Sequence, residues 1–321
     1  IAAYNDENEI FDVELTRKMS DIGLLGICVP KEYGGQGLDT LSYIIAVEEL
    51  SRIDGSTAAT IAADNSLGIS PIKEYGTKEQ KEKYLPRLCR THLWGFGLTE
   101  ETAGCDSRGT KSTARREGDK WILNGSKIFI TNSATAMTLG STVQVISGEK
   151  DGKPEFTTFL MENDTPGFSQ EPMNRKMMWR ASNTGRLTFE NVVLSDENIL
   201  GVPGQGSRIM LATLDGGRLS IAAMGLGCAQ GAYEMALAYS KEREQFGKPI
   251  SKFQAVSFKL ADMAMKIEAA RCLLYKACRM KDAGLPFGKE AAMAKLYCSE
   301  VAAEVCDNAV QVMGGHGLLK D

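Results

Sequence analysis

Two stretches of this chain place small polar residues directly after an apolar segment. They are residues 96–107 (FGLTEETAGCDS) and residues 124–132 (NGSKIFITN). Each is typical of a strand that leads into or out of a turn rich in Gly, Ser, Thr or Asn. Such a turn exposes backbone N–H groups and hydroxyls, which suit a polar, phosphate-bearing cofactor. An ordinary strand and loop without a ligand would show the same pattern, so each stretch alone leaves both interpretations open.

Together, the two stretches resemble the flavin-binding strands of the acyl-CoA dehydrogenase family, and the resemblance continues over nearly the whole chain. It implies that the cofactor is FAD, which the protein would orient and tune electronically. By this resemblance Phe96, Leu98 and Thr99 would bind the edge of the isoalloxazine. Phe129 would pack on the ring face, and Thr131 would donate a hydrogen bond toward N5.

The turn after the first strand departs from the family's usual pattern. That pattern is Thr-Glu-Pro-x-Ala-Gly-Ser-Asp, and residues 99–106 read TEETAGCD. The resemblance implies cofactor contacts for Gly104 and Cys105, with the thiol in place of the Ser that contacts phosphate. A thiol is a weak donor, but the backbone N–H groups of the turn can still serve.

Further candidate FAD residues lie in the C-terminal third. Residues 243–254 (REQFGKPISKFQ) resemble the family's RxxFG…Q motif, which reaches the FAD of a neighbouring subunit. Roles are thereby implied for Arg243, Phe246 and Gln254. An Arg at a helix end is more often a solvated charge, although its planar donors suit a pyrophosphate.

Residues 311–317 (QVMGGHG) resemble the family's Q-x-x-GG-x-G turn, which closes over the adenosine of that same FAD. This resemblance implies roles for Gln311 and Gly315. If both C-terminal motifs carry over, each FAD is shared between subunits. We therefore expect a homo-oligomer, namely a tetramer built as a dimer of dimers.

Candidate substrate residues also come from the resemblance. Residues 176–190 resemble a family stretch in which Ser182 would meet the CoA moiety, and Arg218 matches an Arg that helps to anchor CoA. Arg218 could instead be a simple helix-start charge. Asp64 lies in a segment that the resemblance puts near the acyl pocket. We expect Asp64 to face solvent, the alternative being a role in acyl specificity.

The family's chemistry needs a carboxylate base for the α-proton of the thioester. Most members carry this Glu in a Tyr-Glu-Gly-Thr stretch that would lie beyond Asp321, and others place it directly before the Arg that matches Arg218. That second position is Gly217, which has no side chain. No base is therefore nominated, and we expect the chain to be truncated at both ends.

The pattern of apolar residues predicts an α+β multidomain protein. We expect an N-terminal α-helical domain over residues 1–92, an antiparallel β domain of sandwich or barrel type over 93–205, and an incomplete C-terminal helical bundle over 206–321. Asn124-Gly125 is predicted to be a turn, and Pro86 to end a charged helix. Gly225-x-Gly227 lies in a helical pattern, which favours close helix packing over a dinucleotide loop. An apolar stripe predicts a long helix; its members are Val256, Leu260, Met263, Ile267, Ala270 and Leu274.

Composition excludes several classes of protein. The net charge of −4 comes from intermixed acidic and basic residues, without the basic face of a nucleic-acid-binding protein. No continuous apolar run approaches the ~18–20 residues of a membrane span, so we expect no membrane insertion. The eight cysteines form no CxxC pair and the chain has two histidines, so we predict no metal site and free thiols in a reducing compartment. That compartment would be the bacterial cytoplasm or the mitochondrial matrix.

The resemblance implies an oxidoreductase that converts an acyl-CoA to the trans-2-enoyl-CoA. The Cα proton would leave to a base, the Cβ hydride would move to flavin N5, and the electrons would pass to an electron-transfer flavoprotein. A short-chain acyl-CoA is the preferred substrate. One alternative is a CoA-thioester flavoenzyme with altered chemistry, such as a desulfinase or an enoyl-CoA reductase. Another is a non-catalytic, assembly-type relative, which would tend to lose the FAD contacts that this chain retains.

Overall fold

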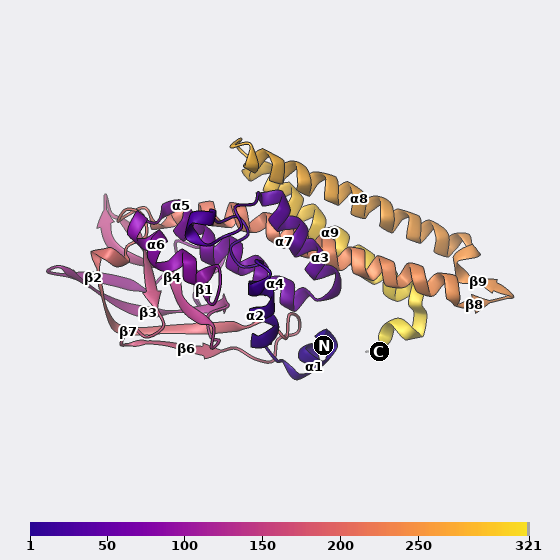
Figure 1. Ribbon diagram of the computed structural model, residues 1–321, viewed down its shortest axis with the longest axis horizontal. Helices are drawn as coiled ribbons and strands as arrows, with labels where there is room; N and C mark the ends of the chain where they lie inside the picture. The colour runs from indigo at the N-terminus through magenta and orange to yellow at the C-terminus, as the bar shows by residue number, and fades with distance from the viewer. Residues whose placement is uncertain (320–321) are drawn as a thin grey trace. The chain divides into compact units, whose positions relative to one another are not determined.

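The computed structural model describes residues 1–319 and divides the chain into two compact units (Figure 1). The first unit combines Ile1–Asp39 with Thr60–Gly217. The second combines Thr40–Ala59 with the residues from 218 onward. The chain thus enters the second unit early, leaves it for the β region and returns.

The first unit contains short helices and all the long strands. Its helical elements are α1 (Ala2–Asn8), α2 (Val13–Asp21), η1 (Lys31–Tyr33), the C-terminal part of α4 (Gly55–Ala63), the π-helical turn η2 (Asp64–Ile69), α5 (Ser70–Tyr75), α6 (Lys78–Leu88) and η3 (Asp196–Asn198). The strands are β1 (Leu93–Gly97), β2 (Thr113–Glu117), β3 (Lys120–Thr131), β4 (Thr138–Lys150), β5 (Lys153–Glu162), β6 (Phe168–Pro172) and β7 (Thr184–Ser195). Helix α6 continues two residues beyond Pro86, so the expected stop at this proline is wrong.

The seven strands form one sheet in the order β1-β4-β2-β3-β7-β6, with β5 on the other side of β4. The expectation of a wholly antiparallel sheet is wrong, because β1 pairs with β4 in parallel and Thr113 of β2 pairs in parallel with Ile146 of β4. The physical reason is the long connection between β1 and β4, which contains a loop and the β2–β3 hairpin. Such a connection is long enough to return the chain in the same direction.

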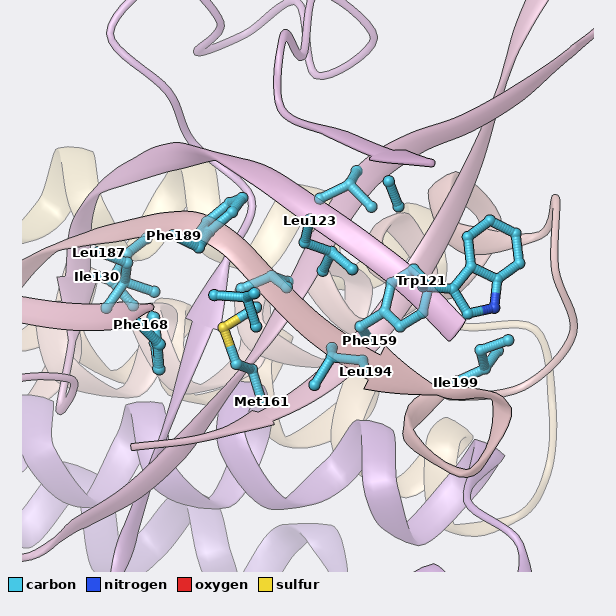
Figure 2. Close-up of a cluster of buried hydrophobic side chains, with 14 residues drawn as sticks. Trp121, Leu123, Ile130, Phe159, Met161, Phe168, Leu187, Phe189, Leu194 and Ile199 are labelled. Atoms are coloured by element: carbon cyan, nitrogen blue, oxygen red, sulfur yellow. The ribbon is translucent and has the colours of Figure 1, made fainter. Parts of the chain in front are cut away.

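The core of the β region shows that the sheet curves on itself. The rings of Trp121 on β3 and Phe159 on β5 lie 5.6 Å apart edge to face, although their strands are not neighbours in the sheet. Figure 2 shows these rings among the other buried side chains of the cluster. This packing agrees with the predicted sandwich or barrel.

Asn124 and Gly125 lie inside β3 and not in a turn, which corrects the sequence prediction. The pairing of β3 with β7 shifts register between Leu123 and Gly125, as in a β-bulge. Gly125 has φ +147°, and a Cβ there would lie 2.3 Å from Ser112 Oγ. Glycine is therefore required at a place where the entry to β2 approaches β3.

The second unit is helical. Its elements are α3 (Thr40–Ile53), the N-terminal part of α4, most of α7 (Gly206–Glu242), the hairpin strands β8 (Glu244–Gln245) and β9 (Lys248–Pro249), η4 (Ile250–Lys252), α8 (Gln254–Asp282), α9 (Gly288–Met313) and η5 (Gly314–Leu318). The predicted apolar stripe lies on α8, where all of its members except the half-buried Val256 are buried.

The side chain of Asp282, at the end of α8, caps the start of α3. Its carboxylate oxygens accept the N–H groups of Thr40 at 2.8 Å and Leu41 at 3.2 Å. These N–H groups have no partner within their own helix, so the cap supplies the missing acceptors. A residue late in the chain therefore completes a helix that begins at position 40.

Helix α7 is long and apolar enough to cross a membrane by length and composition alone. Of its most apolar 18-residue stretch, 56% is buried inside the structure. A core helix gives the same result, and the absence of membrane insertion remains a prediction.

Candidate functional site

The end of β1 and the middle of β3 run next to each other in the first unit. The Ile128 N–H donates to the Thr99 carbonyl at 2.9 Å. Phe96 and Leu98 are buried in a cluster with Met210. Four predicted flavin residues, Phe96, Leu98, Thr99 and Phe129, thereby lie in segments that the backbone holds together.

Phe129 has a strained backbone and an exposed ring. Its φ is +59°, which is uncommon for a bulky residue, and its side chain is 62% exposed. The β3–β7 pairing is irregular between Lys127 and Ile130, and it resumes at Ile130 opposite Gly185. A strained, exposed aromatic residue in the middle of a strand marks a position that stability alone does not explain.

The turn after Thr99 offers exposed polar backbone. The backbone groups of Glu100 and Ala103 pair with each other in both directions, at 3.0 and 3.2 Å. Gly104 and Cys105 beyond them are exposed, and a Cβ at Gly104 would meet nothing within 4 Å. The turn therefore leaves room for a ligand beside its backbone.

Sequence reasoning missed a buried ion pair behind this turn. Lys127 Nζ lies 2.6 Å from Glu100 Oε1, and the side-chain exposures are 0% and 6%. Burial lowers the pKa of Lys127 to about 8, against the opposing effect of Glu100. Burial alone would raise the pKa of Glu100, but hydrogen bonds, led by that from Lys127, hold it below its ordinary value. A lysine directly before the apolar run from Ile128 to Ile130 was the available signal.

Asp64 does not face solvent, which corrects the expectation for this residue. It is fully buried at the start of the π-helical turn η2, and its Oδ1 accepts the Trp94 N–H at 3.2 Å. Its Oδ2 is buried with no hydrogen-bond partner in the structure. Burial raises the pKa of this carboxyl well above its ordinary value, although the Trp94 hydrogen bond acts in the opposite direction.

The predicted CoA residue Ser182 is buried and lies near the end of β3. Its neighbour Asn183 accepts the Asn132 N–H through its carbonyl at 3.1 Å. Gly217, the alternative position for a base, is buried, and a Cβ there would lie 3.1 Å from Leu67 Cδ2. Arg218 follows on α7 and is half-buried.

The second unit gathers its candidate residues around one end of its long helices. Arg243 directly follows α7, Phe246 lies at the tip of the β8–β9 hairpin and Gln254 begins α8, as Figure 1 lets the reader follow. The Ile250 N–H donates to the Arg243 carbonyl at 2.8 Å, and the rings of Phe246 and Phe253 lie 6.0 Å apart.

The C-terminal turn is joined to α7 by an aromatic contact. The rings of His316 and Tyr239 lie 5.7 Å apart, which puts η5 beside the last turns of α7. The candidate residues Arg243, Phe246, Gln254, Gln311 and Gly315 are all exposed. They are therefore available to a ligand or to a second copy of the chain.

The residues of the first unit fit a flavin nucleotide. Phe96, Leu98 and the exposed ring of Phe129 offer apolar contact, and Thr99 and Thr131 add hydroxyl groups at the ends of their segments. The open turn at Gly104 adds backbone N–H donors for an anionic group. Over residues 1–319, no group of three or more His, Cys, Asp or Glu side chains is arranged to hold a metal ion.

Comparison with known proteins matches the chain to three family models. They are the N-terminal domain of acyl-CoA dehydrogenase over residues 1–92, the middle domain over 95–192 and the C-terminal domain over 204–321. A short-chain specific acyl-CoA dehydrogenase of Clostridium acetobutylicum is 47% identical over 100% of this chain and 84% of its own length.

Two solved structures have a very similar fold. Butyryl-CoA dehydrogenase from Megasphaera elsdenii has a TM-score of 0.95 and 44% identity, covering 99% of this chain and 84% of that one. A structure described under the electron transferring flavoprotein of Acidaminococcus fermentans has a TM-score of 0.95 and 48% identity, with the same coverage.

Proposed function

This chain belongs to the acyl-CoA dehydrogenase family, and from that premise we propose that its preferred substrate is a short-chain acyl-CoA such as butyryl-CoA. It is an FAD-dependent oxidoreductase that dehydrogenates an acyl-CoA thioester to the trans-2-enoyl-CoA and passes electrons to an electron-transfer flavoprotein. The short-chain preference is supported by the names of similar proteins, which are short-chain specific or act on butyryl-CoA. We place the reaction in the bacterial cytoplasm or the mitochondrial matrix.

We assign the flavin-binding residues in two groups. Phe96, Leu98 and Thr99 bind the edge of the isoalloxazine, and the ring of Phe129 packs on its face. The strained and exposed state of Phe129 is the observation that carries this assignment most directly, because the fold alone gains nothing from it. Thr131 donates toward the polar edge of the ring, and the backbone at Gly104 and Cys105 binds phosphate.

The second group is Arg243, Phe246, Gln254, Gln311 and Gly315. We propose that these exposed residues bind the FAD of a neighbouring subunit in a tetramer built as a dimer of dimers. Their exposure in a single chain supports this role. Ser182 and Arg218 contact the CoA moiety.

When bound, FAD supplies the acceptor for the hydride that leaves the β-carbon. The chain's own residues orient the thioester against the ring and exclude water from it. The buried side chains of Phe96 and Leu98 form an apolar wall that excludes water from the site. We assign no residue of this chain as the base, since Gly217 has no side chain and Asp64 is enclosed behind β1.

The test is an anaerobic titration of the purified flavoprotein with butyryl-CoA and with longer or branched acyl-CoAs. We expect the visible absorbance of the oxidised flavin to bleach, most readily with butyryl-CoA. Bleaching only by long or branched acyl-CoAs would contradict the short-chain proposal. Bound flavin that no acyl-CoA bleaches would contradict dehydrogenation itself.

A further inference from the structure

We propose that the buried Glu100–Lys127 ion pair is a positioning clamp for the flavin, which fixes the end of β1 against the middle of β3. The proposal rests on the function proposed above, because it takes Leu98, Thr99 and Phe129 as flavin-binding residues. Neither Glu100 nor Lys127 belongs to the groups assigned to contact FAD. Their role is to hold the two segments that do.

The Glu100 carboxylate joins three segments of the chain. Oε1 accepts from Lys127 Nζ at 2.6 Å, from Ser112 Oγ at 2.7 Å and from the Ser112 N–H at 3.2 Å. Oε2 accepts the Lys111 N–H at 2.7 Å. The turn after β1, the entry to β2 and the middle of β3 therefore meet at one carboxylate.

Lys127 binds the first segment a second time. Its Nζ lies 3.4 Å from the Leu98 carbonyl, and the next residue, Ile128, donates its N–H to the Thr99 carbonyl at 2.9 Å. Two successive residues of β3, Lys127 and Ile128, thus make hydrogen bonds to residues 98, 99 and 100. Phe129 comes directly after them, so any movement of the pair shifts Phe129 relative to Leu98 and Thr99.

The backbone of β3 is irregular at Gly125, where the strand meets the segment that leads into β2. Gly125 takes φ +147°, and Ser112 occupies the space where a Cβ would stand. Ser112 Oγ also lies 3.3 Å from the Ser126 carbonyl, which fixes it against β3. The bulge at Gly125 thereby brings the third segment within reach of Glu100.

Stability does not account for such a pair. Taking both charges out of water costs several kcal/mol, and replacing a buried pair by uncharged residues of similar volume is often neutral or stabilising. The pair instead fixes the relative positions of the three segments, because only one arrangement satisfies all of its hydrogen bonds. Sites that bind a cofactor depend on supporting groups of this kind.

The experiment compares Glu100→Gln, Lys127→Met and the double variant with the wild type. The measurements are the melting temperature of the apoprotein, the Kd for FAD and the reduction potential of the bound flavin. Each single variant leaves one buried charge without its partner, so we expect both to melt earlier. We expect the double variant to recover most of the melting temperature, while its Kd for FAD remains raised by ~10-fold or more.

The neighbouring surface pair supplies a matched control. Arg186 and Glu101 lie 2.7 Å apart with side chains that are 39% and 60% exposed. We expect the double variant Glu101→Gln/Arg186→Met to keep the wild-type Kd and potential. A loss of FAD affinity there equal to that of the buried pair would contradict the clamp.

Ser112→Ala keeps both charges and removes one hydrogen bond to Glu100, so it tests the clamp in a protein that folds. We expect a smaller but measurable rise in the Kd for FAD. A double variant and a Ser112→Ala variant that both bind FAD as the wild type does, with the same potential, would overturn the clamp alone. A wild type that takes up no FAD would instead overturn the proposed function.

Discussion

Asp64 is a carboxyl group with no access to water and one hydrogen bond to the protein, from the Trp94 N–H. The unpartnered Oδ2 makes the ionised form costly, because a buried charge needs several donors. Its pKa is raised by burial, so the folded protein binds this proton more tightly than the unfolded chain does. Stability therefore falls as the pH rises above the unfolded pKa of about 4.

We predict that Asp64→Asn raises the free energy of unfolding at pH 7 by ~1–3 kcal/mol, since the amide cannot ionise and keeps an acceptor for Trp94. The gain should shrink as the pH falls toward the unfolded pKa of about 4 and vanish below it, where the wild-type carboxyl is protonated in both states. Thermal or urea unfolding of both proteins between pH 4 and pH 8 measures it. Asp119→Asn, at an exposed turn residue, is the control and should change neither curve. Parallel pH profiles for Asp64→Asn and the wild type would refute the assignment.

At the scale of elements, glycines of α7 set how closely it approaches α3 in the helical unit. A Cβ at Gly227 would lie 2.2 Å from the Glu48 carbonyl oxygen, and one at Gly231 would lie 2.2 Å from that of Arg52. Both obstacles are backbone atoms, which cannot rotate away. The predicted role of the glycine motif in close packing is confirmed for this pair of helices.

We predict that Gly231→Ala destabilises the protein by ~1–3 kcal/mol through overpacking, despite the better helix propensity of Ala. Gly225→Ala is the matched variant on the same helix. Its nearest neighbour, the Cys298 carbonyl oxygen, is 3.1 Å away, so a small shift suffices and the change in stability should be much smaller. Urea unfolding of the two variants gives the comparison. Equal losses in both would show that the close approach at Gly231 does not matter.

The elements also show where sequence patterns succeed. The spacing of apolar residues predicts α8 because one face repeats the same burial from Leu260 to Cys278, about five turns of helix. The β strands were harder to predict from the sequence. Asn124-Gly125 is predicted to be a turn, yet it lies inside one continuous strand, with a bulge at Gly125 where Ser112 packs against it. A contact between distant residues decided the conformation, and local sequence does not report it.

Part of the candidate site could likewise be predicted from local sequence patterns. Motifs drew attention to the turn at residues 99–106 and to Phe129, because glycines and small polar residues mark such places. The sequence did not predict the Glu100–Lys127 pair or the burial of Asp64, since both depend on which segments of the chain become neighbours. The parallel pairing of β1 with β4 was not predicted either, because local patterns do not give the relative direction of two strands.

At the scale of the whole molecule, the long helices of the second unit expose large apolar side chains. Phe258 and Met265 on α8 and Leu296 on α9 are each more than half exposed. Together with the exposed Phe246 hairpin, they offer an apolar surface that the tetramer proposed above would bury. In that assembly, subunit contact and FAD binding depend on each other.

We predict that light scattering finds four 34.8-kDa chains per particle for the FAD-loaded protein. Met265→Glu combined with Leu296→Glu should lower the particle mass and release FAD, because charge on a buried contact is costly. Val193→Glu, at an exposed position on β7, should leave both mass and FAD content unchanged. A monomeric wild type with full FAD content would refute the shared site.

The Asp282 cap on α3 has a consequence for synthesis on the ribosome. Helix α3 is made early, yet the carboxylate that accepts its first N–H groups is separated from Thr40 by 242 positions. The α3 segment must therefore wait, with its apolar face uncovered, while the whole β region emerges. Long-range closure of this kind slows folding and exposes the nascent chain to aggregation. We expect the β region to acquire structure first during translation and the helical unit to close only once α8 has left the exit tunnel.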